Sequence, residues 1–194
     1  MEETIKEKTA SMGCENFKFF ENESAQGFAV TYGDYILMIF RGTQFNTHFE
    51  LRDLVNGLMF RLKHIGKEVK AHGGVLENYS LLKDQVAIYI KDHPTKTLVV
   101  GGHSLGGGTA SLASLEFDCI GYSFGSIRSI KSTWANREKP FFNIINTGDI
   151  VAEYPTRLSG LTHYGTRYMM DADGNLSDKK KFTLSILKVL GFIG

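Results

Sequence analysis

Short apolar runs alternate with helical patterns along most of this chain. The runs predicted as strands are 26–32, 35–40, 97–100, 118–124, 141–146 and 161–170. Gly33 and Asp34 separate the first two runs, which predicts a β-hairpin. Apolar residues recur at helical spacing between Gly73 and His93, and Pro94 ends that helix. Strands that alternate with helices predict a mainly parallel central sheet with helices on both faces, the arrangement of an α/β protein.

The remaining segments give weaker patterns. Residues 1–25 are predicted to be a polar lead-in with a short helix, anchored on the core by Phe17, Phe19 and Phe20. A short edge strand is expected between His64 and His72, and a polar loop between Ser129 and Lys139.

Two amphipathic segments each leave two interpretations open. Residues 45–62 mix apolar and charged positions at near-helical spacing, which fits a packed helix or a mobile flap with a lid over 45–58. The tail 178–190 alternates lysines with apolar residues and is predicted to be a basic amphipathic helix. Such a helix either packs on the core with its lysines in solvent or lies on a lipid surface.

The stretch Thr97–Gly108 contains the candidate catalytic nucleophile. An apolar strand leads into Gly102-His103-Ser104-Leu105-Gly106, and a run of small residues then opens a helix. A Gly-x-Ser-x-Gly sequence between a strand and a helix is typical of a nucleophile elbow, in which a strained turn presents the serine. A phosphate-binding loop is the alternative, but no Gly-Lys-Ser/Thr follows. The sequence therefore predicts Ser104 as a nucleophile.

Donors for an oxyanion are predicted on two neighbouring elements. The N–H group of Leu105 follows the nucleophile at the start of a helix, where backbone donors are unpaired. Arg41-Gly42-Thr43 ends a central strand, so that Thr43 offers a second donor. Thr43 and Leu105 are the candidate oxyanion hole.

A serine nucleophile needs a base that a carboxylate orients. Asp149 is the best candidate acid, because it follows the apolar strand 141–146 at the edge where ligands bind in parallel sheets. His163 is the only histidine after Asp149, and acid and base follow the serine in this order in α/β-hydrolases. The candidate triad is Ser104, Asp149 and His163.

Composition limits the other possibilities. The 194 residues are expected to form one domain, 1–194, and the net charge of +1 does not favour a nucleic-acid partner. Two cysteines and a charged N-terminus without an apolar segment predict a cytoplasmic protein, and no transmembrane run is expected. We expect no cofactor and no metal site; the sequence leaves the oligomeric state open.

The chain resembles the class 3 lipase family of fungal triacylglycerol lipases and plant acyl hydrolases over residues 26–170. The motifs that carry the resemblance are Ile39–Thr43, Arg52-Asp53-Leu54, His72-Gly73-Gly74 before Tyr79, Gly102–Gly107, Tyr122–Ser126 and Asp149-Ile150-Val151 before Pro155. It implies an α/β-hydrolase fold, ester hydrolysis by Ser104 with Asp149 as acid, an oxyanion hole of Thr43 and Leu105, and a lid.

The chain departs from the family pattern at its histidine. His163 matches a position where many members carry a histidine that is not the base, and their catalytic histidine comes later, in a turn near the C-terminus. Either His163 has taken this role, or the chain stops short of the catalytic turn, or the enzyme is impaired. Three functions stay open: a hydrolase of lipid esters, at a membrane or droplet surface; an impaired hydrolase that binds lipid or a partner, which the missing late histidine favours; and an esterase for small soluble esters.

Overall fold

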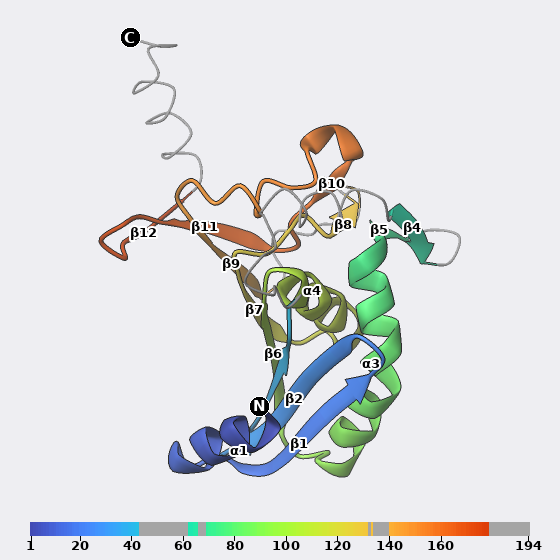
Figure 1. Cartoon of the computed structure of the whole chain (residues 1–194), viewed down its shortest axis with the longest axis vertical. Coiled ribbons are helices and arrows are strands. Elements are labelled where there is room, and N and C mark those ends of the chain that lie inside the picture. Colours follow the sequence, from blue (N-terminus) through green and yellow to red (C-terminus); the bar gives the residue numbers. More distant parts are fainter. Residues whose placement is uncertain (43–61, 66–68, 132, 134–139, 179–194) are drawn as a thin grey trace.

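The computed structural model describes residues 1–42, 62–65, 69–131, 133 and 140–178. In chain order its elements are α1 (Glu2–Ser11), β1 (Glu15–Asn22), β2 (Ala25–Tyr32), β3 (Tyr35–Phe40), β4 (Leu62–Ile65), β5 (Val69–His72), α3 (Gly73–Asp92), β6 (Thr97–His103), α4 (Leu105–Phe117), β7 (Ile120–Phe124), β8 (Ile130–Lys131), β9 (Phe141–Asn146), a 3₁₀ turn (Arg157–Ser159), β10 (Leu161–Thr162), β11 (Thr166–Met170) and β12 (Leu176–Asp178). Figure 1 shows their arrangement.

The central sheet has the strand order β1-β2-β3-β6-β7-β9-β11-β12. Strands β3, β6, β7, β9 and β11 are parallel neighbours, while β1 and β2 add antiparallel strands at one edge and β12 adds one at the other. Residues 25–40 form the hairpin expected around Gly33 and Asp34. The mainly parallel α/β sheet predicted from the alternating pattern is confirmed.

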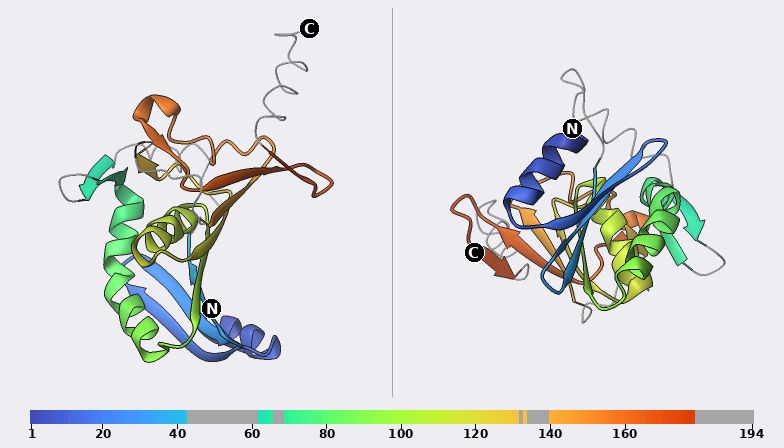
Figure 2. Two further views of the ribbon diagram at one scale, coloured as in Figure 1. Left: turned by 180° about the vertical axis from the view of Figure 1, so that it is seen from behind. Right: turned by 90° about the horizontal axis from the view of Figure 1, so that it is seen from below.

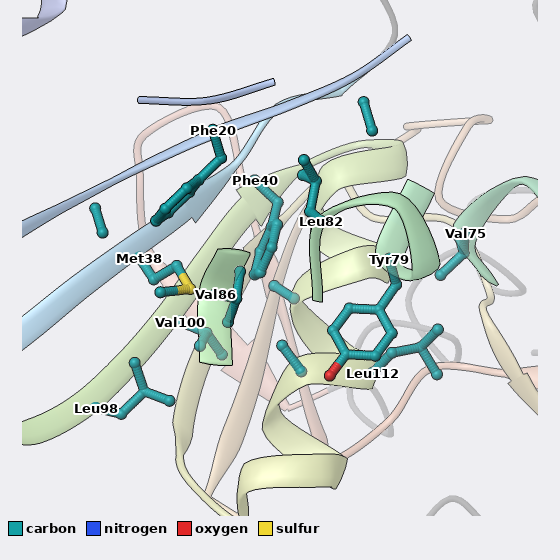
Figure 3. Close-up of a cluster of buried hydrophobic side chains, with 14 of the residues drawn as sticks. Phe20, Met38, Phe40, Val75, Tyr79, Leu82, Val86, Leu98, Val100 and Leu112 are labelled. Atoms are coloured by element: carbon teal, nitrogen blue, oxygen red, sulfur yellow. The ribbon is translucent and has the colours of Figure 1, made fainter. Parts of the chain in front are cut away.

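Helices lie on both faces of this sheet. The buried face of the sheet packs under α3 and α4, which also contact each other, and α1 lies on the opposite side (Figure 2). The core between the sheet and these two helices is built from side chains that alternate along the strands with residues of the other face (Figure 3). Its largest members include Phe20, Phe40, Met38 and Leu82, each at most 1% exposed.

Three segments differ from the sequence prediction. Residues 15–22 form strand β1 rather than a lead-in, and of its three phenylalanines only Phe20 is fully buried. The expected edge strand at 64–72 is a hairpin of β4 and β5, which belongs to a second sheet of order β10-β8-β5-β4. The expected last strand 161–170 is divided, because β10 pairs with β8 in the small sheet whereas β11 pairs with β9 in the central one.

Several predicted features lie outside the described residues. These are Thr43, the lid at 45–58 and the tail helix, except that Asp178, its predicted first residue, ends strand β12. Within the described residues, none of the helices has the length and apolar character needed to span a bilayer.

Candidate active site

Ser104 occupies the turn between β6 and α4. Its backbone has φ 54° and ψ −124°, its N–H donates to the carbonyl of Phe124 at 3.0 Å, and the residue is 5% exposed. A positive φ is costly for a residue with a Cβ and occurs mostly where function requires the turn. The predicted strand–turn–helix with a strained serine is confirmed.

The flanking glycines let the elbow pack against its neighbours. A Cβ atom on Gly102 would lie 2.3 Å from the carbonyl oxygen of Gly106, and one on Gly106 would lie 2.2 Å from the carbonyl oxygen of Phe40. Both distances are far below van der Waals contact, so glycine is required at 102, where β6 meets the first turn of α4, and at 106, where α4 approaches the end of β3.

The end of β3 lies against the elbow. A Cβ atom on Gly42 would lie 2.7 Å from the carbonyl oxygen of His103 and 3.4 Å from the Cβ of Ser104. Leu105 is the first residue of α4, so its N–H lies in the first turn, where helical amides have no partner within the helix and the helix dipole is positive. Gly42 therefore lies beside the nucleophile, and Thr43, which follows it, lies outside the described residues.

Asp149 lies in the turn after β9, and its carboxylate is held from two sides. Its Oδ1 accepts hydrogen bonds from the N–H groups of Val151 at 2.9 Å and Ala152 at 3.3 Å. Its Oδ2 lies 2.8 Å from the position of a Cβ on Gly125, a point that is 3.5 Å from Nε2 of His103. Asp149 is therefore fixed at the carboxyl ends of the central strands, next to the residue that precedes Ser104.

His163 lies between β10 and β11 and is 3% exposed. Its Nε2 donates a hydrogen bond to the carbonyl oxygen of Ser126 at 2.8 Å. A ring nitrogen that donates a proton to a carbonyl cannot accept one from Ser104 at the same time. The role of His163 as base stays a prediction, and Nε2 can fill it only after it gives up the hydrogen bond to Ser126.

Arg128 is a residue that the sequence analysis missed. It is 2% exposed, it donates to the carbonyl oxygens of Glu153 and Pro155, the latter at 2.8 Å, and it pairs with the Glu153 carboxylate. The backbone N–H of Arg128 also donates to the carbonyl of Tyr154 at 2.8 Å. The guanidinium thus holds the loop that follows Asp149. Nothing in the sequence around Arg128 indicates that its side chain is buried, because arginines in predicted loops are usually exposed.

The match to a family model covers residues 37–159, with the description "Lipase (class 3)". This match includes the last four residues of β3, the elbow and the Asp149 loop, and it covers more than half of the chain. The chain belongs to the class 3 lipase family. Groups of three or more His, Cys, Asp or Glu residues placed to hold a metal are absent from the part of this lipase-family chain that the structure describes.

Fungal lipases are among the similar proteins. The chain is 26% identical to a lipase of Rhizopus niveus over 150 residues, which are 67% of this chain and 37% of the relative, and 28% identical to a lipase of Rhizomucor miehei over 51% of this chain and 32% of the relative. It therefore spans about a third of the length of these curated relatives.

Solved structures show the same fold. Lipase II of Rhizopus niveus has a TM-score of 0.69 at 24% identity and covers 82% of this chain and 68% of its own. A second structure, described as a triacylglycerol lipase whose catalytic centre is a serine protease triad, has a TM-score of 0.65 at 24% identity over 79% of this chain and 66% of its own. The α/β-hydrolase fold expected from the motifs is thereby confirmed.

Proposed function

We propose that this protein hydrolyses carboxylic esters of lipids with Ser104 as the nucleophile. The observation that carries the proposal is the conformation of Ser104, which has a positive φ at the N-terminus of α4 and lies in contact range of the end of β3. The lipase activity of the fungal relatives and the serine triad of a structural relative support the same chemistry.

The elbow supports a two-step reaction. Ser104 Oγ attacks the ester carbonyl carbon, and a histidine oriented by Asp149 accepts the serine proton. The N–H of Leu105 and the hydroxyl of Thr43 are the donors predicted to stabilise the oxygen that becomes negative. The intermediate expels the alcohol, which takes the proton from the histidine and leaves an acyl group on Ser104. Water then releases the acid by the same steps.

A lipid ester at a surface is the proposed substrate. The curated relatives are lipases, and one structural relative is described through a model for interfacial activation. An esterase for small soluble esters uses the same residues, so the site does not distinguish a lipase from an esterase. The dependence of the hydrolysis rate on substrate concentration does. A lipase turns over tributyrin faster once the ester exceeds its solubility, whereas an esterase saturates below that limit.

The test compares the parent with Ser104→Ala on p-nitrophenyl butyrate. Loss of a triad nucleophile is expected to lower the rate by about 10⁴–10⁶-fold with an unchanged circular dichroism spectrum. Undiminished turnover by the folded variant would overturn the proposal.

A second candidate is a hydrolase-fold protein that binds lipid without turning it over. The hydrogen bond of His163 Nε2 to Ser126 favours it, because this ring is then committed to the scaffold. A parent that binds a vesicle of neutral lipid and hydrolyses no ester would support this candidate.

A further inference from the structure

The face of the central sheet opposite α3 and α4 carries a cavity of about 780 Å³. Helix α1 lies over this face and contacts β1 (Figure 2). Ile5 of that helix lines the cavity together with residues of β1, β2, β3, β6 and β7. Pockets that bind small organic ligands have volumes of about 300–1,000 Å³. The cavity between α1 and the sheet therefore has the size of a ligand site.

Most of the cavity wall is apolar. Phe19 of β1 and Phe28 of β2 belong to it. So do Ile39, Tyr122 and Phe124, whose side chains stay 36%, 40% and 48% exposed. Large apolar side chains that stay exposed together around a concave surface are typical of a binding site. The apolar wall indicates a ligand with a hydrocarbon body.

The polar side chains of the cavity gather at one end. The register that pairs β2 with β3 and β3 with β6 continues to Gln26, Arg41 and His103, which are all lining residues. Arg41 Nη1 donates a hydrogen bond to Oε1 of Gln26. His103 lies on the same face as Val99, because side chains alternate along β6. The polar end of the cavity is thus at the carboxyl ends of β3 and β6.

The charge at this polar end is positive. A guanidinium is always charged and has five N–H donors, so Arg41 can bind a further acceptor beside the Gln26 amide. None of the described residues that line the cavity is Asp or Glu. The carboxylate of Glu21 is not among the lining residues, and it accepts a hydrogen bond from Nε2 of Gln26. The cavity therefore suits a ligand with an apolar body and one anionic end.

We propose that this cavity binds a single-chain fatty acid as its carboxylate. The head group lies at Arg41 and His103, and the hydrocarbon chain lies between α1 and the sheet. A carboxylate matches the paired donors of a guanidinium, and each buried methylene group adds to the hydrophobic contribution. The proposed site is separate from the nucleophile, because Ser104 is not among the described lining residues. It goes beyond the hydrolysis proposed above and does not rest on it.

Titration of decanoate into the full chain with Ser104→Ala tests the proposal. This background excludes turnover by Ser104, so the result is independent of whether the protein hydrolyses esters. Isothermal titration gives the affinity and stoichiometry for decanoate and for 1-decanol, which has the same chain and a neutral head group. We expect one decanoate site per chain. Arg41→Gln should weaken decanoate by at least about tenfold and change decanol by less than about twofold, because only the carboxylate loses a charge-assisted pair.

A tryptophan in the cavity tests where the chain of the ligand lies. Ile39→Trp should weaken both ligands by about tenfold or more, because two groups cannot occupy one closely packed volume. Leu176→Trp is the matched control. Leu176 is also an exposed apolar residue of the central sheet, 53% exposed, but it is not one of the described lining residues. This control should leave both affinities unchanged.

Three results would overturn the proposal. They are the absence of decanoate binding, an equal effect of Arg41→Gln on decanoate and decanol, and an equal effect of the two tryptophans. Where a tryptophan variant fails to fold, 5-doxyl stearate is added to the Ser104→Ala protein instead. Its nitroxide should broaden the amide resonances of Ile5 and Val99 more than that of Leu176. Uniform broadening of the three resonances would place the ligand elsewhere and would also overturn the proposal.

Discussion

The carboxylate of Asp149 lies against the backbone of Gly125, so closely that a Cβ atom on Gly125 would be 2.8 Å from Oδ2. Gly125 follows β7 with φ +52°, a conformation that also favours glycine. The loop after β7 therefore sets where the proposed triad acid can lie. The close approach links two segments that are far apart in the chain, and both adjoin the carboxyl ends of the parallel strands.

Gly125→Ala is expected to displace the Asp149 carboxylate and to lower kcat by up to about 10²-fold, because misplacement of a catalytic group by about 1 Å has effects of this size. Gly174→Ala is the matched control, since Gly174 also has a positive φ, +82°, but nothing lies within 4 Å of its added Cβ. Steady-state kinetics and thermal unfolding are measured for both. Similar stability losses with an equal change in kcat would show that backbone strain alone is responsible.

Arg128→Met is expected to lower the free energy of unfolding by on the order of 2–4 kcal/mol, because it leaves the carbonyl oxygens of Glu153 and Pro155 without their buried donor. Glu153→Gln removes only the ion pair, whose carboxylate side chain is 53% exposed, and should lower stability by less than about 1 kcal/mol. Urea unfolding of the two variants checks this order. An Arg128→Met protein as stable as Glu153→Gln would contradict the role given to the guanidinium.

His163→Gln separates the two roles of His163. If His163 is the catalytic base, its replacement is expected to lower kcat by about 10³-fold or more. If His163 is structural, the replacement should leave kcat within about tenfold and lower the melting temperature. The hydrogen bond to Ser126 favours the second outcome. In that case an added C-terminal turn that carries a histidine should raise the hydrolysis of p-nitrophenyl butyrate, and an otherwise identical turn with alanine should not.

Cys119 gives a pH-dependent prediction. Burial raises the pKa of its thiol from 9.0 to about 11. The unfolded chain therefore loses this proton at a lower pH than the folded chain does. The contribution of Cys119 to the free energy of unfolding should be fully present below about pH 9 and should be lost as the pH rises to about 11. Urea midpoints across this range, compared with Cys119→Ala, measure the contribution; parallel curves would contradict it.

The sequence predicted those parts of the fold that depend on local pattern. The hairpin around Gly33 and Asp34, the helix at 73–93 and the elbow at Ser104 each follow from residues close together in the chain. Strand β1 was missed because Phe17, Phe19 and Phe20 supply both faces of the strand instead of one. The division of 161–170 between two sheets was missed as well, because strand partners are set by tertiary contacts that a single strand pattern does not encode.

The part of the candidate site that could be predicted from the sequence is the part that requires particular residues at fixed spacing. Gly102 and Gly106 are required by backbone contacts of the elbow, so their spacing around Ser104 is visible in the sequence. The hydrogen bonds of Arg128 and of His163 join segments more than twenty residues apart, and no local pattern indicates them. Sequence spacing therefore predicted the elbow conformation at Ser104 better than it predicted the surroundings of His163.

Labelling with a fluorophosphonate tests the central claim, that Ser104 is an activated nucleophile, most directly. The reagent forms a covalent adduct only with a serine whose hydroxyl is activated, and intact mass with peptide mapping identifies the residue. The account predicts one adduct per chain on the peptide that contains Ser104, and none on folded Ser104→Ala. A folded parent chain that forms no adduct, or an adduct on another residue that persists in Ser104→Ala, would contradict it.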